Sequence, residues 1–309
     1  MAVWDAVRAR IRAKVLETVH GGDLRLERYR RPPGDPGLFG PGSPVWDVHG
    51  HAVGMLTGGF AALMLQSLHP LAMAGVAEHS DYRADPLGRL SRTARYVTVT
   101  AFGSTADAEA QIAAVRKVHT YIHGISPDGV AYSAEDPDLL TWVHTAEIRS
   151  FLAGYQAFAG RRRLDQAQCD RYVADVALLA RRLGAREVPH SVAELEAYLT
   201  RARPDLRPTP AALAAVGFLR AFGRDTVERT ATSILMNGGI SLLPAWARAQ
   251  LGIRRPAPVR HLIDRPAARL LGALLVWACG PSEVAAAARD RAEAKPLDTA
   301  TTRAESSSM

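Results

Sequence analysis

The sequence contains few cysteines and few aromatic residues. Two cysteines in 309 residues exclude a disulfide framework and a cysteine-based zinc site, and they fit a reducing compartment. Aromatic residues make up 6% of the chain, so strong helix formers such as Ala, Leu and Arg outnumber strand formers. We find no alternating strand pattern and no internal repeat, and the hydrophobic content of 48% is that of a globular protein. We therefore expect an all-α, single-domain fold.

The common catalytic and nucleotide-binding motifs are also missing. The sequence has no P-loop, no Gly-x-Ser-x-Gly elbow and no Gly-x-Gly-x-x-Gly after a strand. Two Glu-x-x-His strings begin at Glu17 and Glu187, but the first lies at the edge of the chain and the second contains Pro189. Neither suits a di-iron helix bundle, which needs both motifs on packed helices.

Positive charge exceeds negative charge without forming a dense cluster. The net charge is +7, yet the longest basic run is Arg161–Arg163, and no zinc finger or RNA-binding motif accompanies it. We interpret the excess as a solvated basic surface and expect no nucleic-acid partner.

Long uninterrupted hydrophobic runs are absent as well. Residues 52–77 carry no charge over a length that could span a membrane, but Pro70 and nearby polar residues divide them. We expect two buried helices here, with membrane contact as the alternative. Residues 1–20 resemble a basic amphipathic helix and lack the apolar core of a signal peptide. The expected location is cytoplasmic, and peripheral membrane contact remains open.

Helix-start signals divide the chain into segments. Residues 1–44 form an expected N-terminal helix and Gly/Pro-rich arm, residues 45–285 a helical domain, and residues 286–309 a disordered tail. Asp85-Pro86 predicts a helix to about Phe102, and Asp136-Pro137 predicts one to about Ala159. Between them, a helix is expected from about Ser104 to His123. Ser191 and Thr209-Pro210 mark two later helix starts.

Two histidines occupy the helix expected over residues 104–123. His119 continues the apolar stripe of Ala108, Ile112 and Val115, and His123 lies one turn further along nearly the same face. A histidine buried among aliphatic residues requires partners for its nitrogens. The partner is either an iron or zinc ion or, more simply, a backbone carbonyl or a carboxylate.

The next helix carries a second polar pair on its apolar face. His144 and Glu147 are one turn apart, so Glu147 could orient a histidine or the two could hydrogen-bond each other. Trp142 could pack on a flat cofactor or belong to the ordinary core.

Arg89 and Thr93 are also one turn apart, beside the apolar stripe of the helix after Asp85-Pro86. An arginine suits a carboxylate or propionate because its guanidinium binds such groups with two hydrogen bonds. The alternative is an exposed arginine without a ligand.

Taken together, four segments resemble the MpaB-type oxygenases, whose catalytic domain is shared with rubber oxygenase, the latex-clearing protein. The resemblance covers about residues 45–252, with its elements in family order. It implies an all-helical, globin-like fold that holds haem b and performs oxidative chemistry with dioxygen. The segments are HPLAMAGVAEHSDYRADPLGRLSRTARYV, AAVRKVHTYIHG, YSAEDPDLLTWVH and SLLPAWARAQLG.

The resemblance also implies roles for single residues. His119 matches the family's haem-ligating histidine, with His123 as the reserve, and Arg89 and Thr93 match its Arg-x-x-x-Thr element. Arg89 would meet a haem propionate or shape the pocket, with Thr93 as a hydrogen-bond donor. Glu78 is the nearest candidate for the family's suspected glutamate base, while Arg92 replaces a lysine that can cap the iron.

Two function classes follow from the resemblance. The first is a haem-dependent oxygenase that uses dioxygen on an apolar small molecule, such as a prenyl-like or lipid-like compound. The second is a haem-binding sensor or carrier with the same pocket. Rubber itself is not the expected substrate, because the sequence shows no export signal.

Overall fold

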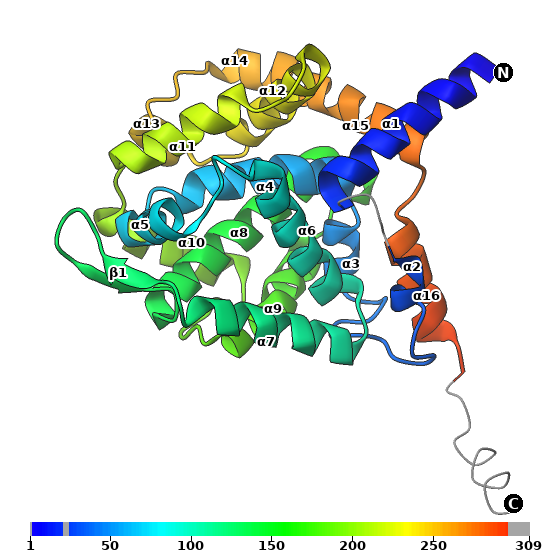
Figure 1. Cartoon of the computed structure of the whole chain (residues 1–309), viewed down its shortest axis with the longest axis horizontal. Helices are drawn as coiled ribbons and strands as arrows, with labels where there is room; N and C mark the ends of the chain where they lie inside the picture. The colour runs from blue at the N-terminus through cyan, green and yellow to red at the C-terminus, as the bar shows by residue number, and fades with distance from the viewer. Residues whose placement is uncertain (1, 21–24, 296–309) are drawn as a thin grey trace, which may run out of the picture.

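The computed structural model describes residues 2–20 and 25–295 of the chain. Helices make up nearly all of its regular structure, so the all-α prediction is confirmed (Figure 1). The helices are α1 (Ala2–His20), α2 (Leu26–Tyr29), α3 (Pro44–His49), α4 (Ala52–Gln66), α5 (Pro70–His79), α6 (Pro86–Phe102), α7 (Thr105–His119), α8 (Pro137–Phe158), α9 (Gln166–Leu183), α10 (Val192–Ala202), α11 (Pro210–Ala221), α12 (Thr226–Ile240), α13 (Ala245–Gln250), α14 (Ala257–Val259), α15 (Arg265–Cys279) and α16 (Glu283–Glu293).

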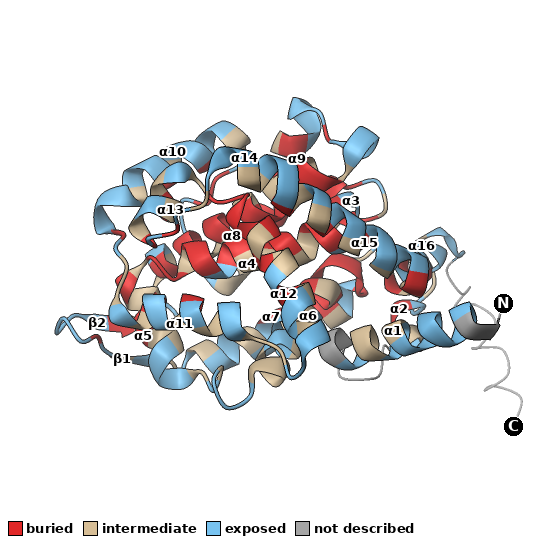
Figure 2. Cartoon of the chain, turned by 90° about the horizontal axis from the view of Figure 1, so that it is seen from above, coloured by how far each residue is buried: buried red, intermediate tan, exposed pale blue. Residues whose placement is uncertain are grey.

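Helices α4 and α8 form the centre of the molecule, and the other helices pack around them (Figure 2). The two helices run antiparallel and approach closely because glycines face each other. A Cβ atom on Gly154 would overlap the carbonyl oxygen of Gly54, and one on Gly58 would lie 2.8 Å from the carbonyl oxygen of Ser150. This close contact explains why α4 is rich in small residues.

The helix starts expected from the sequence are confirmed. Asp85 caps α6 by accepting a hydrogen bond from the amide of Gly88, and Asp136 caps α8 in the same way through the amide of Asp138. Pro70 begins α5, which is bent by 107° from α4, so residues 52–77 are two helices as expected. No single helix in the described ranges has the length and hydropathy to cross a membrane, although two bent helix pairs pass that test together.

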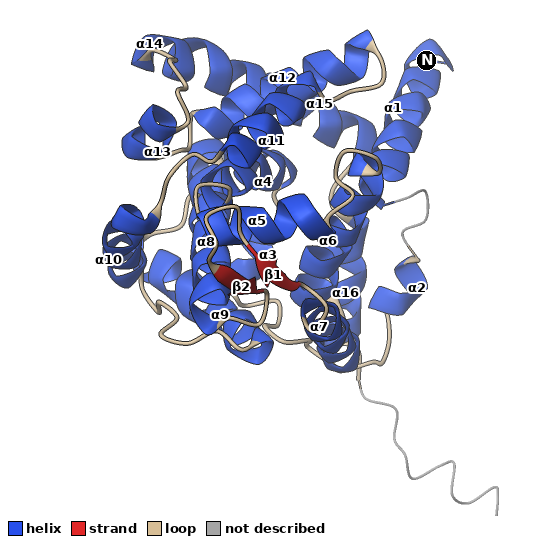
Figure 3. Ribbon diagram, turned by 60° about the vertical axis from the view of Figure 1, so that its left-hand side comes forward, coloured by secondary structure: helices blue, strands red, loops and turns tan. Residues whose placement is uncertain are grey.

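The helix expected to reach His123 is shorter. Helix α7 ends at His119, and His123 begins a two-stranded antiparallel hairpin of β1 (His123–Ile125) and β2 (Ala131–Ser133) (Figure 3). The two strands are joined by a turn at Pro127-Asp128-Gly129, where Gly129 has φ of +78° and reverses the chain. The expectation that His123 shares a helix face with His119 is therefore wrong.

The end of the domain also differs from the expectation. Residues 286–293 belong to α16 rather than to a disordered tail, because the Arg291 side chain is buried and donates hydrogen bonds to four backbone carbonyls. These are the carbonyls of Tyr29, Asp35, Phe102 and Gly103, so Arg291 fixes the N-terminal arm to the end of α6. The remaining expected tail, residues 296–309, lies outside the described residues.

Candidate functional site

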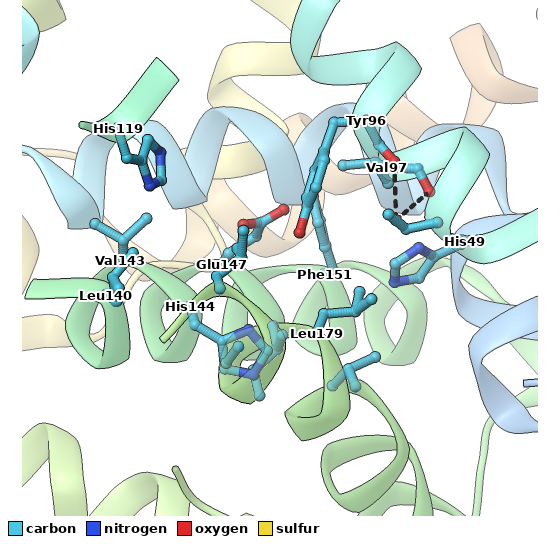
Figure 4. Close-up of a pocket in the computed structure, with 15 residues that line it drawn as sticks. His49, Tyr96, Val97, His119, Leu140, Val143, His144, Glu147, Phe151 and Leu179 are labelled. Carbon is cyan, nitrogen blue, oxygen red and sulfur yellow. Dashed lines mark hydrogen bonds between the residues drawn. The ribbon is translucent and has the colours of Figure 1, made fainter. Parts of the chain in front are cut away.

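A cavity lies between α6, α7, α8 and α9, with one side chain from α3 (Figure 4). Atoms leave about 600 Å³ of space here, including the part that opens to solvent. Its wall is mainly aliphatic, and the polar groups that interrupt it are largely titratable. The lining residues are His49, Tyr96, Val97, Thr100, His119, Leu140, Val143, His144, Glu147, Ile148, Phe151, Val176, Leu179, Ala180 and Leu183.

His119 reaches this cavity from the last residue of α7. The stripe of Ala108, Ile112 and Val115 faces inward as predicted, so His119, one turn later, faces the same way. Its Nδ1 atom is buried and has no hydrogen-bond partner in the described part of the chain. Burial lowers the pKa of the imidazole, an effect that Glu135 partly opposes. The result is a neutral ring with an unsatisfied nitrogen inside an apolar cavity.

His144 and Glu147 line the same cavity from α8, but no hydrogen bond joins them within the described ranges. The Nε2 atom of His144 has no partner there, and burial lowers the pKa of His144 to about 3. Burial raises the pKa of Glu147 to about 7. The alternative in which the two side chains hydrogen-bond each other is therefore wrong. His144 is therefore neutral near neutral pH, whereas Glu147 is ionised only in part there.

Two titratable residues of the cavity, His49 and Tyr96, were not identified from the sequence. His49, at the end of α3, hydrogen-bonds through Nε2 to the Tyr172 hydroxyl at 3.2 Å, whereas its Nδ1 has no partner among the described residues. Burial lowers the pKa of His49 to about 4. Tyr96 enters from α6, and Figure 4 shows its hydroxyl turned toward Glu147. Burial, together with the nearby Glu147 carboxyl, raises the pKa of Tyr96.

Trp142 does not line the cavity. Two residues before His144 on α8, it points to a different side of the helix and is 1% exposed. Its indole Nε1 donates a hydrogen bond to the carbonyl of Gln66, at the end of α4. Trp142 is therefore a core residue between the two central helices, and its predicted role in packing on a cofactor is not supported.

Arg89 and Thr93 lie on the same face of α6 as predicted, but outside the cavity lining. The Arg89 guanidinium donates to the hydroxyl of Ser80, and burial lowers its pKa. The exposed Thr93 hydroxyl donates to the Arg89 carbonyl at 3.1 Å. Their suggested contacts with a propionate or with oxygen stay predictions.

Glu78 and His123 are found together on another part of the surface. Both are exposed, and the hydroxyl of Tyr132, on β2, donates to the Glu78 carboxylate. His79 hydrogen-bonds with the same hydroxyl and with the His123 carbonyl. Neither Glu78 nor His123 lines the cavity that His119 enters.

A scan against protein-family models matches residues 46–279 to "ER-bound oxygenase mpaB/B'/Rubber oxygenase, catalytic domain". The chain belongs to this family. It is thus an oxygenase-type enzyme, and membership implies a small-molecule substrate and dioxygen as reactants. Searches of curated proteins and of solved structures gave no significant match. The matched range contains every residue that lines the cavity.

Proposed function

We propose that this MpaB/rubber oxygenase family member is a haem b-dependent oxygenase that uses dioxygen on an apolar small molecule. The observation that carries the proposal is the unpartnered, buried Nδ1 of His119 in a mainly aliphatic cavity. A neutral imidazole is a common iron ligand, and haem requires only one such group from the protein when its other face stays open.

The residues present fit a haem better than a bare metal ion. Nowhere in residues 2–20 or 25–295 do three or more His, Cys, Asp or Glu side chains gather in an arrangement that could hold a metal. A bare metal ion held by protein alone needs several such donors, whereas haem brings four nitrogen ligands of its own. Aliphatic side chains from α8 and α9 suit the apolar macrocycle.

In this proposal the haem supplies the oxygen chemistry, and the protein supplies position and surroundings. His119 holds the group at the end of α7. The walls formed by Leu140, Val143 and Leu179 exclude water and favour an apolar substrate. Glu147, with its pKa near 7, can hold or release a proton inside the cavity at physiological pH.

We expect His119→Ala to remove most bound haem. The variant leaves the aliphatic wall but deletes the one ring that α7 contributes to the cavity. The measurement is the Soret absorption per protein after haem has been supplied to the wild type and to the variant. His123→Ala is the matched control, because His123 is an exposed histidine four residues away and should retain full occupancy.

His144→Ala and His49→Ala complete the series, since both histidines also have an unpartnered nitrogen in the cavity. Full haem occupancy and an unchanged spectrum in His119→Ala would refute the assignment. Loss of haem only in His144→Ala or His49→Ala would move the ligand to that residue. Haem binding without oxygen consumption in a screen of lipid extracts would favour a sensor or carrier.

A further inference from the structure

Helix α15 reverses the usual distribution of side chains on a surface helix. Its inward face consists of small residues such as Ala268 and Gly272, and a Cβ atom on Gly272 would lie only 2.7 Å from Cβ of Val53 on α4. Several of its large apolar residues point outward instead, since Leu270 is 75% exposed and Leu274 is 44% exposed. A surface helix in a globular protein normally exposes polar residues.

The apolar surface extends beyond α15 on both sides. Ile263, two helical turns before Leu270, is 58% exposed. At the other end, Trp277 meets Trp4 of α1 edge to face, with ring centres 6.2 Å apart, and Trp4 is 65% exposed. Helices α1 and α15 pack side by side at one edge of the molecule (Figures 1 and 3). We name the residues Trp4, Ile263, Leu270, Leu274 and Trp277 the α1–α15 face.

The two sequence segments that build this face carry a net positive charge, although Arg12 and Lys14 of α1 form ion pairs with Glu283 and Glu228. Residues 2–20 carry four basic and two acidic side chains, and residues 254–279 carry five arginines and one aspartate. Their formal net charges are +2 and +4. Arg8 stacks over the Trp277 ring at 5.6 Å, and Arg10 and Arg254 are exposed.

We propose that the α1–α15 face docks on the surface of a membrane that contains anionic phospholipids. Exposed leucine and isoleucine side chains can enter the boundary between headgroups and acyl chains, and tryptophan favours that boundary. Arginines beside them are attracted to anionic headgroups. A second copy of this chain is a poorer occupant, because it would bring the same positive charge against itself.

The expected contact is interfacial. Helix α15 lies along the protein and packs with one side on α4 and α12. Only its outer side can therefore contact the bilayer. Binding should therefore depend on both apolar area and salt, since the electrostatic attraction between exposed charges is screened by ions.

The test is co-sedimentation of the full-length protein with vesicles of phosphatidylcholine, with or without phosphatidylglycerol. We expect the wild type to bind the anionic vesicles and to be released in part by high salt. Leu270→Ser/Leu274→Ser should weaken this binding by roughly tenfold or more. Arg8→Gln/Arg10→Gln should weaken binding only to the anionic vesicles and reduce its salt dependence.

Val118→Ser is the matched control, because Val118 is 56% exposed on α7, at the opposite edge of the molecule in Figure 1. It should bind like the wild type. Failure of the wild type to bind anionic vesicles would overturn the proposal, and so would equal binding by the double leucine variant with an unchanged melting temperature. Light scattering that shows a dimer in the wild type and a monomer in that variant, without vesicle binding, would assign the face to self-association and overturn it as well.

Discussion

Gly154→Ala is expected to lower the free energy of unfolding by about 3 kcal/mol, a large part of the stability of a domain of this size. Its new methyl group would overlap the carbonyl oxygen of Gly54, which belongs to the backbone of α4 and cannot rotate away. The two central helices must then separate. This separation disturbs the contacts that α4 makes with α12 and α15 and those that α8 makes with α9 and α10.

Gly59→Ala is the control on the same pair of helices. A Cβ atom on Gly59 would meet nothing within 4 Å, so alanine should instead stabilise α4 by about 0.5–1 kcal/mol through its higher helix propensity. Chemical denaturation of both variants, with equal slopes against denaturant, gives the two free energies. Similar effects of the two substitutions would contradict the argument that the glycine contact determines the helix spacing.

Helix starts were predictable because they depend on local chemistry. Asp85 and Asp136 each precede proline, and the carboxylate that accepts an amide hydrogen bond lies within a few residues of its donor. The hairpin after α7 also had a local signal, the turn at Pro127-Asp128-Gly129. The prediction gave more weight to the spacing of apolar residues, which continues up to His123. The anchoring of α16 by Arg291 had no local signal, because its partners lie between 188 and 262 residues away.

The candidate site was predictable in part for the same reason. His119 and His144 interrupt apolar helix faces, so their inward direction follows from helical periodicity. His49 and Tyr96 give no such signal, since their place in the cavity depends on how α3 and α6 meet α8 and α9. The prediction for Trp142 failed for a different reason. Trp142 is two residues from His144 in the sequence, but residues two apart on a helix point to different sides of it.

In the wild type, the carboxyl of Glu147 is expected to change the free energy of unfolding by about 3 kcal/mol as pH rises, and Glu147→Gln should remove this change. In the unfolded chain the carboxyl has its ordinary pKa of 4.5, and in the folded protein burial raises the pKa to about 7. Below pH 4.5 both states hold the proton, and the carboxyl costs no stability. Between these pKa values the unfolded state releases the proton first, so the free energy of unfolding falls as pH rises and levels off above about pH 7.

Glutamine keeps the shape of the side chain and does not titrate, so the variant should gain stability relative to the wild type as pH rises from 4.5 to 7. The lowered pKa values of His49 and His144 reduce the free energy of unfolding toward acid pH. This contribution is the same in the variant and the wild type, so it cancels in the difference between them. The measurement is denaturant unfolding at several pH values across this window.

Glu187→Gln, which changes an exposed carboxylate, should differ from the wild type by a nearly constant amount. A constant difference for Glu147→Gln as well would mean that Glu147 is ionised in the folded protein at neutral pH, and it would remove this residue as a proton-holding group of the cavity.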